Sequence, residues 1–338
     1  MARLRVAVIM GGRSSEHEIS VASARSVVEG LDAERYEVRE IEIGRDGRWE
    51  LPRTRQEEIG PGASPLPVPL NGQPEPLGDI DVVFPVLHGP FGEDGTVQGF
   101  LELAGVAYVG AGVTASALCM DKDLFKAVMR DKGIPVVDSV TVLERNRQSV
   151  ENPFGYPVVI KPARLGSSVG ISVVKTAGEL SSAINLAFEH DEKVLLEQYV
   201  AGVEVECSVL GNEEPIASIP GEIVPLVSDW YDYRAKYEEG GMDLVIPPRL
   251  DEHTIARVQE LAVAAFVASD CEGMARVDFF VRDDGEVLVN ELNTIPGFTS
   301  TSVYAKLFEA SGIPYQQLLD RLVALALERR DRRARLKY

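Results

Sequence analysis

The sequence predicts an α/β protein of two or three lobes, with a parallel sheet in its N-terminal part and strand-rich lobes after it. Its 338 residues, 45% of them hydrophobic, suffice for a large buried core. The N-terminal third alternates apolar strand patterns with helical patterns, which is typical of a parallel sheet. The C-terminal third contains two strand patterns joined by a tight turn, which indicates an antiparallel hairpin.

The N-terminal alternation starts with an apolar strand that ends in a glycine loop. Ser15 and Glu18 have the spacing of a capping box, which predicts that the first helix follows this loop directly. Residues 44–79 are rich in proline and glycine, and we expect a surface excursion without chemistry there. We expect strands at 4–10, 36–43, 79–89 and 106–110, and helices at 19–31 and 96–105.

The remainder of the chain shows no internal repeat. A small glycine- and serine-rich loop joins two strand patterns, and a tyrosine-rich segment at 228–248 precedes a helix, the hairpin and two closing helices. We expect helices at 114–132, 178–188 and 251–269, and strand-rich segments at 158–175, 194–200, 203–211, 216–225 and 275–294.

The hairpin carries acids on one strand face. Asp284-Gly285 predicts a two-residue turn, and a hairpin centred on it pairs Asp278 with Glu291. In the same register Arg276 pairs with Asn293, and all four side chains share one face. The opposite, core face receives Val277, Phe279, Val281, Leu288 and Leu292, with Asn290 as a polar exception.

Directly opposed carboxylates lie roughly 5 Å apart and repel unless a cation lies between them. Asp278, Glu291 and the amide oxygen of Asn293 form an oxygen-rich donor set without His or Cys, which suits magnesium or manganese better than zinc. Considered alone, two strand carboxylates on a solvated face are the simpler interpretation. The other motifs of the chain favour the metal.

Composition excludes several classes of function. The formal charge of −19 argues against an extended surface for nucleic acid or anionic membrane. No apolar run approaches the length of a membrane span, and no secretory signal is expected, so we expect a cytoplasmic protein. Three cysteines without metal-site spacing predict reduced thiols in the core: Cys119, Cys207 and Cys271.

Two glycine-rich segments raise the question of nucleotide binding. The loop "RLGSSVG" at 164–170 lies near Lys161 and suits a cover over phosphates, although such a loop by itself is more often an ordinary hairpin connection. It lacks the P-loop pattern, and a strand follows it instead of a helix. The segment "GAGVTA" at 110–115 matches part of a dinucleotide fingerprint, but no acidic residue ends a second strand about 20 positions later.

Single residues remain ambiguous when they are considered separately. His88 follows a strand of the parallel sheet at the edge where ligands bind, so it either contacts a substrate or caps its loop. Lys122 and Lys236 are merely solvated lysines if nothing else is considered.

Seven segments of the chain occur in the order and spacing of one enzyme family. They are "GGRSSEHEIS", "HGPFGEDG", "MDK", "VIKPARLGSSVG", "YDYRAKY", "ARVDFF" and "NELNTIPGFTS". Together they span essentially the whole chain, and the hairpin derived above is among them. The sequence therefore resembles the D-alanine–D-alanine ligases, which are members of the ATP-grasp superfamily.

This resemblance implies an ATP-grasp fold. The implied domains are an N-terminal Rossmann-like domain at 1–117, a central lobe at 118–200 and a C-terminal lobe at 201–338, with ATP held between the last two. It also implies a cytoplasmic enzyme of peptidoglycan precursor synthesis that acts on small molecules and forms a homodimer.

The resemblance also assigns the nucleotide site. Lys122 and Lys161 would hold the phosphates of ATP, and the region of Ser168 would cover them. The adenine pocket would be lined by Glu197, Tyr199 and Val200, and Glu204 would bind the ribose. Two magnesium ions, or manganese, would bridge the phosphates and bind Asp278, Glu291 and Asn293.

The implied reaction joins two D-alanines through an acyl phosphate. A carboxylate is a poor acyl donor, so ATP phosphorylates it before the second amine attacks. Such chemistry needs positioning and charge neutralisation more than a nucleophilic side chain, and no Ser-His-Asp or Cys-His arrangement competes. Arg276 and the backbone N–H of Gly297 are the family's donors to the oxyanion of the second step.

Substrate contacts follow from the same resemblance. Glu16 would bind the ammonium group of the first D-alanine, and His88 would lie near its carboxylate. Ser302 would hold the carboxylate of the second D-alanine.

The "YDYRAKY" segment would close as a lid that excludes water. It would bring Lys236 towards the γ-phosphate and link Tyr237 to Ser167 and Glu16. Tyrosine at 237 matches dipeptide-forming ligases, whereas phenylalanine marks relatives that use D-lactate.

Three alternatives stay open. A relative could use D-lactate or D-serine as the second substrate. A non-catalytic nucleotide-binding protein could retain the fold, although the metal acids and Arg276 are all present. A dehydrogenase based on residues 110–115 would need tight binding of NAD.

Overall fold

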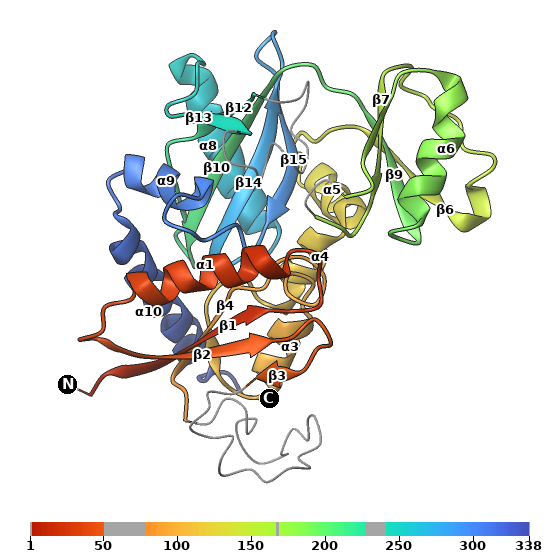
Figure 1. The fold of residues 1–338 in the computed structure, drawn as a ribbon. Coiled ribbons are helices and arrows are strands. Elements are labelled where there is room, and N and C mark those ends of the chain that lie inside the picture. Colours follow the sequence, from red (N-terminus) through yellow and green to blue (C-terminus); the bar gives the residue numbers. More distant parts are fainter. Residues whose placement is uncertain (1, 51–78, 167–168, 227–240, 338) are drawn as a thin grey trace.

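The computed structural model describes residues 2–50, 79–166, 169–226 and 241–337, and their strands form three sheets (Figure 1). The first sheet has the order β3-β2-β1-β4-β5 and is parallel except at its edge strand β3, which confirms the parallel sheet predicted for the N-terminal part. Its strands are β1 (Leu4–Gly11), β2 (Tyr36–Ile43), β3 (Trp49–Glu50), β4 (Val82–Pro85) and β5 (Ala107–Tyr108).

Helices cover both faces of this sheet. α1 (His17–Gly30) packs on the face that carries Val8, and α3 (Thr96–Leu103) packs on the face that carries Ile9. Successive side chains of a strand point to opposite faces, so a sheet covered on both sides requires a continuous apolar run. The apolar sequence of β1 is explained by this double burial.

The start of α1 differs from the prediction. Ser15 and Glu18 are exposed, the N-cap position is Glu16, and no side chain caps the helix, so the predicted capping box is wrong. The buried hydroxyl of Ser14 accepts the backbone N–H of Glu16 at 3.2 Å and donates to the carbonyl of His88 at 2.7 Å. The loop thus turns Ser14 and Glu16 inward instead of capping the helix.

The helix predicted at 114–132 is two helices. α4 (Val113–Met120) ends before Asp121, whose extended backbone caps α5 (Lys122–Asp131) by accepting the N–H of Leu124 at 3.2 Å. Aspartate is a favoured N-cap residue, which explains the break. The break sets the direction of α5.

The second sheet is antiparallel, with the order β6-β9-β7-β8, and has a core of its own. α6 covers it and begins with a capping box formed by Thr176 and Glu179. The elements are β6 (Ser139–Leu143), a 3-10 turn (Glu144–Asn146), β7 (Val158–Pro162), β8 (Ser172–Val174), α6 (Ala177–Phe188) and β9 (Lys193–Gln198).

The third sheet is also antiparallel, with the order β13-β12-β10-β14-β15 and β11 paired to β10. α8 and the apolar face of α5 pack together against it. The elements are β10 (Val203–Gly211), β11 (Ile216–Ala217), β12 (Gly221–Pro225), β13 (Met242–Val245), α8 (Glu252–Ala268), β14 (Gly273–Val281) and β15 (Val287–Asn293).

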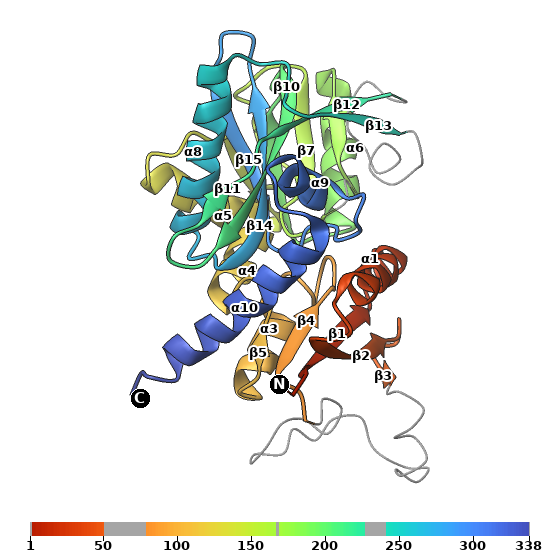
Figure 2. The same ribbon diagram turned by 90° about the vertical axis from the view of Figure 1, so that its left-hand side faces the viewer.

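Two C-terminal helices join the third sheet to the first. α10 (Tyr315–Arg333) runs past the N-terminal sheet, and α9 (Val303–Ala310) lies at the third sheet (Figure 2). One hydrophobic core contains residues of α1, β1 and β4 together with residues of α9, α10 and β14. In the described part of the chain, no helix has the length and apolar character needed to cross a membrane.

The hairpin confirms the predicted pairs on its functional face. Asp278 pairs with Glu291, and Arg276 pairs with Asn293. Beyond them the register shifts by one, because Asn290 is an extra, bulged residue without a partner on β14.

The bulge corrects two predictions. Leu288 pairs with Phe280 and therefore lies off the predicted core face, where Val287 and Val289 are found instead. The turn has three residues, since the N–H of Arg282 donates to the carbonyl of Glu286 at 2.9 Å. An inserted residue reverses the inward and outward alternation, which explains why Leu288 was misassigned.

Candidate active site

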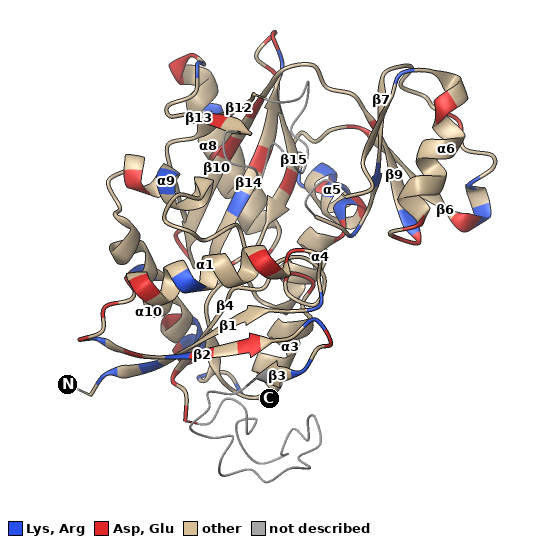
Figure 3. Ribbon diagram, in the orientation of Figure 1, with Lys and Arg blue, Asp and Glu red and all other residues tan. Residues whose placement is uncertain are grey.

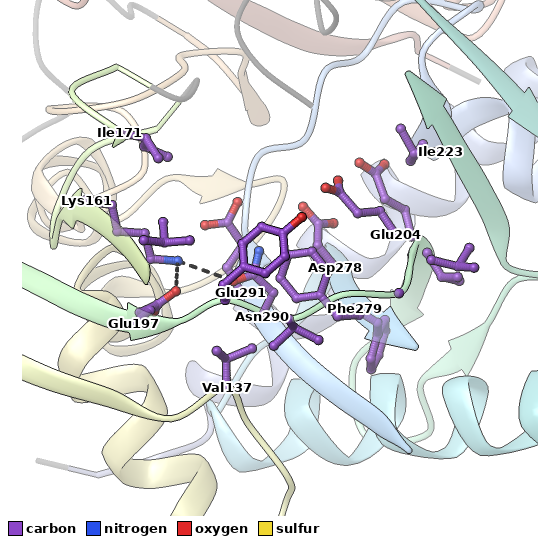
Figure 4. A pocket seen from close by; sticks show the side chains of 18 of the residues that line it. Val137, Lys161, Ile171, Glu197, Glu204, Ile223, Asp278, Phe279, Asn290 and Glu291 are labelled. Atoms are coloured by element: carbon purple, nitrogen blue, oxygen red, sulfur yellow. Dashed lines mark hydrogen bonds and ion pairs between the residues drawn. The ribbon is translucent and has the colours of Figure 1, made fainter. Parts of the chain in front are cut away.

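A cavity of about 360 Å³ lies between the second and third sheets (Figure 4). β7, the end of β9, β10, β14 and β15 all contribute to its walls. It brings together the residues predicted for the nucleotide: Lys122, Lys161, Glu197, Tyr199, Val200 and Glu204, with Asp278 and Glu291.

A second cavity of about 500 Å³ adjoins the first and lies against α1 and the start of α9. Glu291 and Gly166 line both cavities. The second cavity brings together the residues predicted for the reacting substrates: Glu16, His88, Arg276, Gly297 and Ser302, with Asn293.

The hairpin face lies where these cavities meet, and its acids have cationic partners. The guanidinium group of Arg276 donates to both oxygens of Asp278 at 2.7 Å and forms an ion pair with Glu206 at 2.9 Å. The amide of Asn293 donates to Asp278 at 3.0 Å. Figure 3 shows the acidic bands on β10, β14 and β15 and the basic band on β14. Cationic groups of the protein itself therefore offset the carboxylate repulsion that was inferred from the sequence.

Glu291 forms an ion pair with a different cation. Its carboxylate lies 3.2 Å from the ammonium of Lys122, which also donates to the carbonyl of Leu165 at 2.9 Å. Lys122 therefore connects the hairpin to the glycine-rich loop. Among the described residues, no three His, Cys, Asp or Glu side chains form a group that could hold a metal.

Glu197 lies between two lysines in the wall of the first cavity. Lys161 approaches one carboxylate oxygen at 2.7 Å, and Lys126 approaches the other at 3.0 Å (Figure 4 shows the former pair). Burial alone would raise the pKa of Glu197, but the two ammonium groups outweigh it and lower this pKa. Burial lowers the pKa of Lys126 to about 8. Lys161 also donates to the side-chain oxygen of Asn290 at 3.3 Å, so the bulged residue helps to hold this lysine.

His88 is buried in the second cavity. Its Nδ1 lies 2.9 Å from the carbonyl of Ile295, so Nδ1 carries the proton in this contact. Its Nε2 has no hydrogen-bond partner among the described residues. Burial lowers the pKa of His88, and nearby Glu16 opposes that shift.

Glu93 is a site residue that the sequence prediction missed. Its carboxylate accepts the backbone N–H groups of Gly89 at 2.7 Å and Ile295 at 3.2 Å, which connects the loop after β4 to the chain after β15. Burial and then the charge of Glu16 raise its pKa to about 8. Its only signal was its position in the predicted "HGPFGEDG" motif.

Gly297 and Ser302 are neighbours in the second cavity. A Cβ atom at position 297 would lie 3.3 Å from the hydroxyl of Ser302, so glycine keeps this part of the cavity open. The predicted residues Ser167, Ser168, Lys236 and Tyr237 lie outside the described residues.

Sequence reasoning also missed Lys126 and Glu206. Lys126 follows Lys122 by one helical turn, a spacing that puts both on one face of α5. Glu206 lies opposite Asp278 on β10, in a segment for which the sequence predicted only a strand.

A cleft between two antiparallel sheets, joined to a parallel α/β layer, defines the class: this is the ATP-grasp fold of ligases. Two family models match the chain, "D-ala D-ala ligase N-terminus" over residues 5–111 and "D-ala D-ala ligase C-terminus" over residues 128–324. The chain belongs to the D-alanine–D-alanine ligase family.

Individual relatives agree with this family. The chain is 44% identical to a D-alanine–D-alanine ligase of Caldicellulosiruptor bescii, covering 100% of this chain and 99% of the relative. The structure of the D-alanine–D-alanine ligase from Coxiella burnetii superposes with a TM-score of 0.87 at 40% identity, covering 99% and 97% of the two chains. The VanG D-Ala:D-Ser ligase from Enterococcus faecalis superposes with a TM-score of 0.84 at 39% identity, covering 96% and 100%.

Proposed function

We propose that this protein joins two D-alanine molecules into D-alanyl-D-alanine, converting ATP to ADP and phosphate, for peptidoglycan precursor synthesis. The observation that carries this proposal is the shared wall of the two cavities. Glu291 lines both, and Arg276 lines the second one beside it. A nucleotide in one cavity and an amino acid in the other would thus meet at a strongly charged surface.

The charges on this surface support phosphoryl transfer to a carboxylate. Lys122 and Lys161 line the first cavity, where they would hold phosphates and neutralise charge as the acyl phosphate forms. In the second step an amine attacks the acyl carbon and an oxyanion develops. Arg276 and the N–H of Gly297 line the second cavity and would stabilise it.

Asp278, Glu291 and Asn293 would hold magnesium or manganese ions with the nucleotide. The donor set fits, because magnesium commonly takes only one or two protein carboxylates and completes its shell with phosphates and water. The lack of a three-acid cage among the described residues is consistent with that mode. Bound ions would neutralise the phosphate oxygens, and Arg276 and Lys122 now occupy the carboxylates that these ions would share.

The second cavity supports two D-alanine subsites. Glu16 would bind the ammonium group of the first D-alanine and His88 would lie near its carboxylate, since both line the second cavity and not the first. Ser302 would hold the carboxylate of the second. Lid closure by Lys236 and Tyr237 with Ser167, and phosphate cover by Ser168, complete the proposal from family resemblance.

The adenine side of the site follows the same resemblance. Glu197, Tyr199 and Val200 would line the adenine pocket, and Glu204 would bind the ribose. Tyr199 lines the first cavity and keeps 39% of its accessible area exposed.

We also propose the domain division 1–117, 118–200 and 201–338, a cytoplasmic location and a homodimer. The separate hydrophobic core of the second sheet supports a distinct central lobe. Gel filtration with light scattering tests the dimer, and a monomeric mass at working concentration would exclude it.

D-Serine is the second candidate acceptor, because the chain superposes well on a D-Ala:D-Ser ligase. D-Lactate is the third. Phosphate release with ATP, D-alanine and each acceptor in turn, at neutral pH, separates the three. We expect the highest kcat/KM with D-alanine alone, and a clear preference for D-serine or D-lactate would overturn the proposal.

The other two alternatives have less support. A non-catalytic nucleotide-binding protein would not need Arg276, Asp278 and Glu291 on one face at the junction of two cavities. The dinucleotide alternative fails on packing, because Gly110 lies against Gly273 and its carbonyl accepts a hydrogen bond from buried Arg329.

A further inference from the structure

Lys126 is a fully buried lysine. It pairs with a carboxylate, that of Glu197, which lies in the wall of the nucleotide cavity. Its side chain has 0% exposure, and its ammonium lies 3.0 Å from Glu197. The same ammonium also donates to the carbonyl of Val137 at 3.5 Å. Lys126 does not line the cavity, whereas Lys161 and Glu197 do. A ligand can therefore reach Lys161 but not Lys126.

The three groups carry one negative and two positive charges out of solvent. If Lys161 turns from Glu197 towards a phosphate, the carboxylate of Glu197 stays buried at 3% exposure. A buried carboxylate without a counter-ion is strongly unfavourable, so Lys161 alone could not serve both groups. The second lysine removes this conflict, because Glu197 keeps a partner throughout.

We propose that Lys126 is a positioning residue, the permanent counter-ion of Glu197, which releases Lys161 to bind the nucleotide phosphates. This role rests on the proposed function in so far as the ligand is a nucleotide. It predicts that Lys126 contributes to phosphate binding without touching the ligand. Purine binding should depend on Lys126 much less.

The test uses four variants of the full chain. Lys126→Met removes the charge and keeps a long, unbranched side chain. Glu197→Gln removes the carboxylate, and the double variant removes both. Lys132→Met is the matched control, because Lys132 is an exposed lysine just after α5. Dissociation constants of ADP and of adenosine are measured for each variant by isothermal titration calorimetry without D-alanine. Separate assays give kcat, KM for ATP and the free energy of unfolding.

We expect Lys126→Met to weaken ADP binding by about tenfold, because Lys161 must then remain with Glu197. Adenosine binding should change by less than about twofold, and kcat should fall less than KM for ATP rises. In the Glu197→Gln background the same substitution should cost nothing or improve ADP binding, since no carboxylate then needs a partner. Lys132→Met should match the wild type.

Three results would each overturn the proposal. The first is that Lys126→Met binds ADP as tightly as the wild type. The second is that its affinities for ADP and for adenosine fall by the same factor. The third is that Lys126→Met weakens ADP binding in the Glu197→Gln background as much as it does in the wild type. The last two would show a packing role. If Lys126→Met fails to fold, the comparison of the double variant with Glu197→Gln still decides the question. Because ADP binding is measured without D-alanine, failure of the ligase reaction would leave this test intact.

Discussion

The ammonium of Lys122 lies 3.2 Å from the carboxylate of Glu291, which connects the first turn of α5 to the hairpin. Glu291 lines both cavities, and Lys122 reaches the backbone of the glycine-rich loop from the same position. Lys122 therefore connects α5, the hairpin and the glycine-rich loop, and all three line the cavity proposed for the nucleotide. Removing either partner tests the proposed site directly.

Glu291→Gln should preserve the fold and lower kcat by about 100-fold, because phosphate and metal placement would lose a charged ligand. The free energy of unfolding should change by no more than about 2 kcal/mol, since the amide oxygen of the substituted side chain can still accept from Lys122. Steady-state phosphate release and urea unfolding measure the two effects. Glu286→Gln, at an exposed position of the same hairpin, is the control. Near wild-type turnover in Glu291→Gln would refute the metal role of this residue.

Chelation should stop the reaction. With EDTA in excess over divalent ions, phosphate release should fall to background, because the proposed ions neutralise the transferring phosphate. Magnesium or manganese should restore it, since both suit a site of two carboxylates and an amide oxygen. Unfolding curves with and without EDTA check that the fold survives. Full activity in EDTA would show that lysines and Arg276 suffice.

The metal face was predictable because strand alternation and pairing are local properties. Asp278 and Glu291 face each other as predicted, yet Leu288 was assigned to the wrong side. The reason is the bulge at Asn290, where one extra residue shifts the strand pairing. The residue types of the strand do not reveal where this extra residue lies. The predicted helix 114–132 failed for a related reason, because Asp121 can either continue a helix or cap a new one.

The buried charges were beyond local sequence reasoning. Lys126 and Glu93 have ordinary local surroundings in the sequence, and tertiary packing alone decides that both are shielded from water. Glu93 is enclosed by the chain after β15, more than 200 residues away. The residues assigned by family resemblance lie in the two cavities wherever the structure describes them.

Gly297→Ala should lower kcat by at least about tenfold. The added methyl group would lie 3.3 Å from the hydroxyl of Ser302 and narrow the cavity at the proposed oxyanion donor. Gly99→Ala is the matched control, because Gly99 lies within α3 and nothing lies within 4 Å of its added Cβ. The control should retain activity and gain up to about 1 kcal/mol in stability from helix propensity. Equal activity of both variants would remove Gly297 from the reacting part of the site.

Glu93 should make stability depend on pH. Its pKa is raised from 4.5 to about 8 in the folded protein, by burial and by the charge of Glu16. Between these values the folded state holds a proton that the unfolded chain has released, so the contribution of this carboxyl group is complete below pH 4.5 and is lost as the pH rises to about 8. Glu93→Gln cannot ionise and should lose less stability over that range. Urea unfolding at several pH values measures both proteins, and parallel profiles would show that Glu93 is ionised in the folded state at neutral pH.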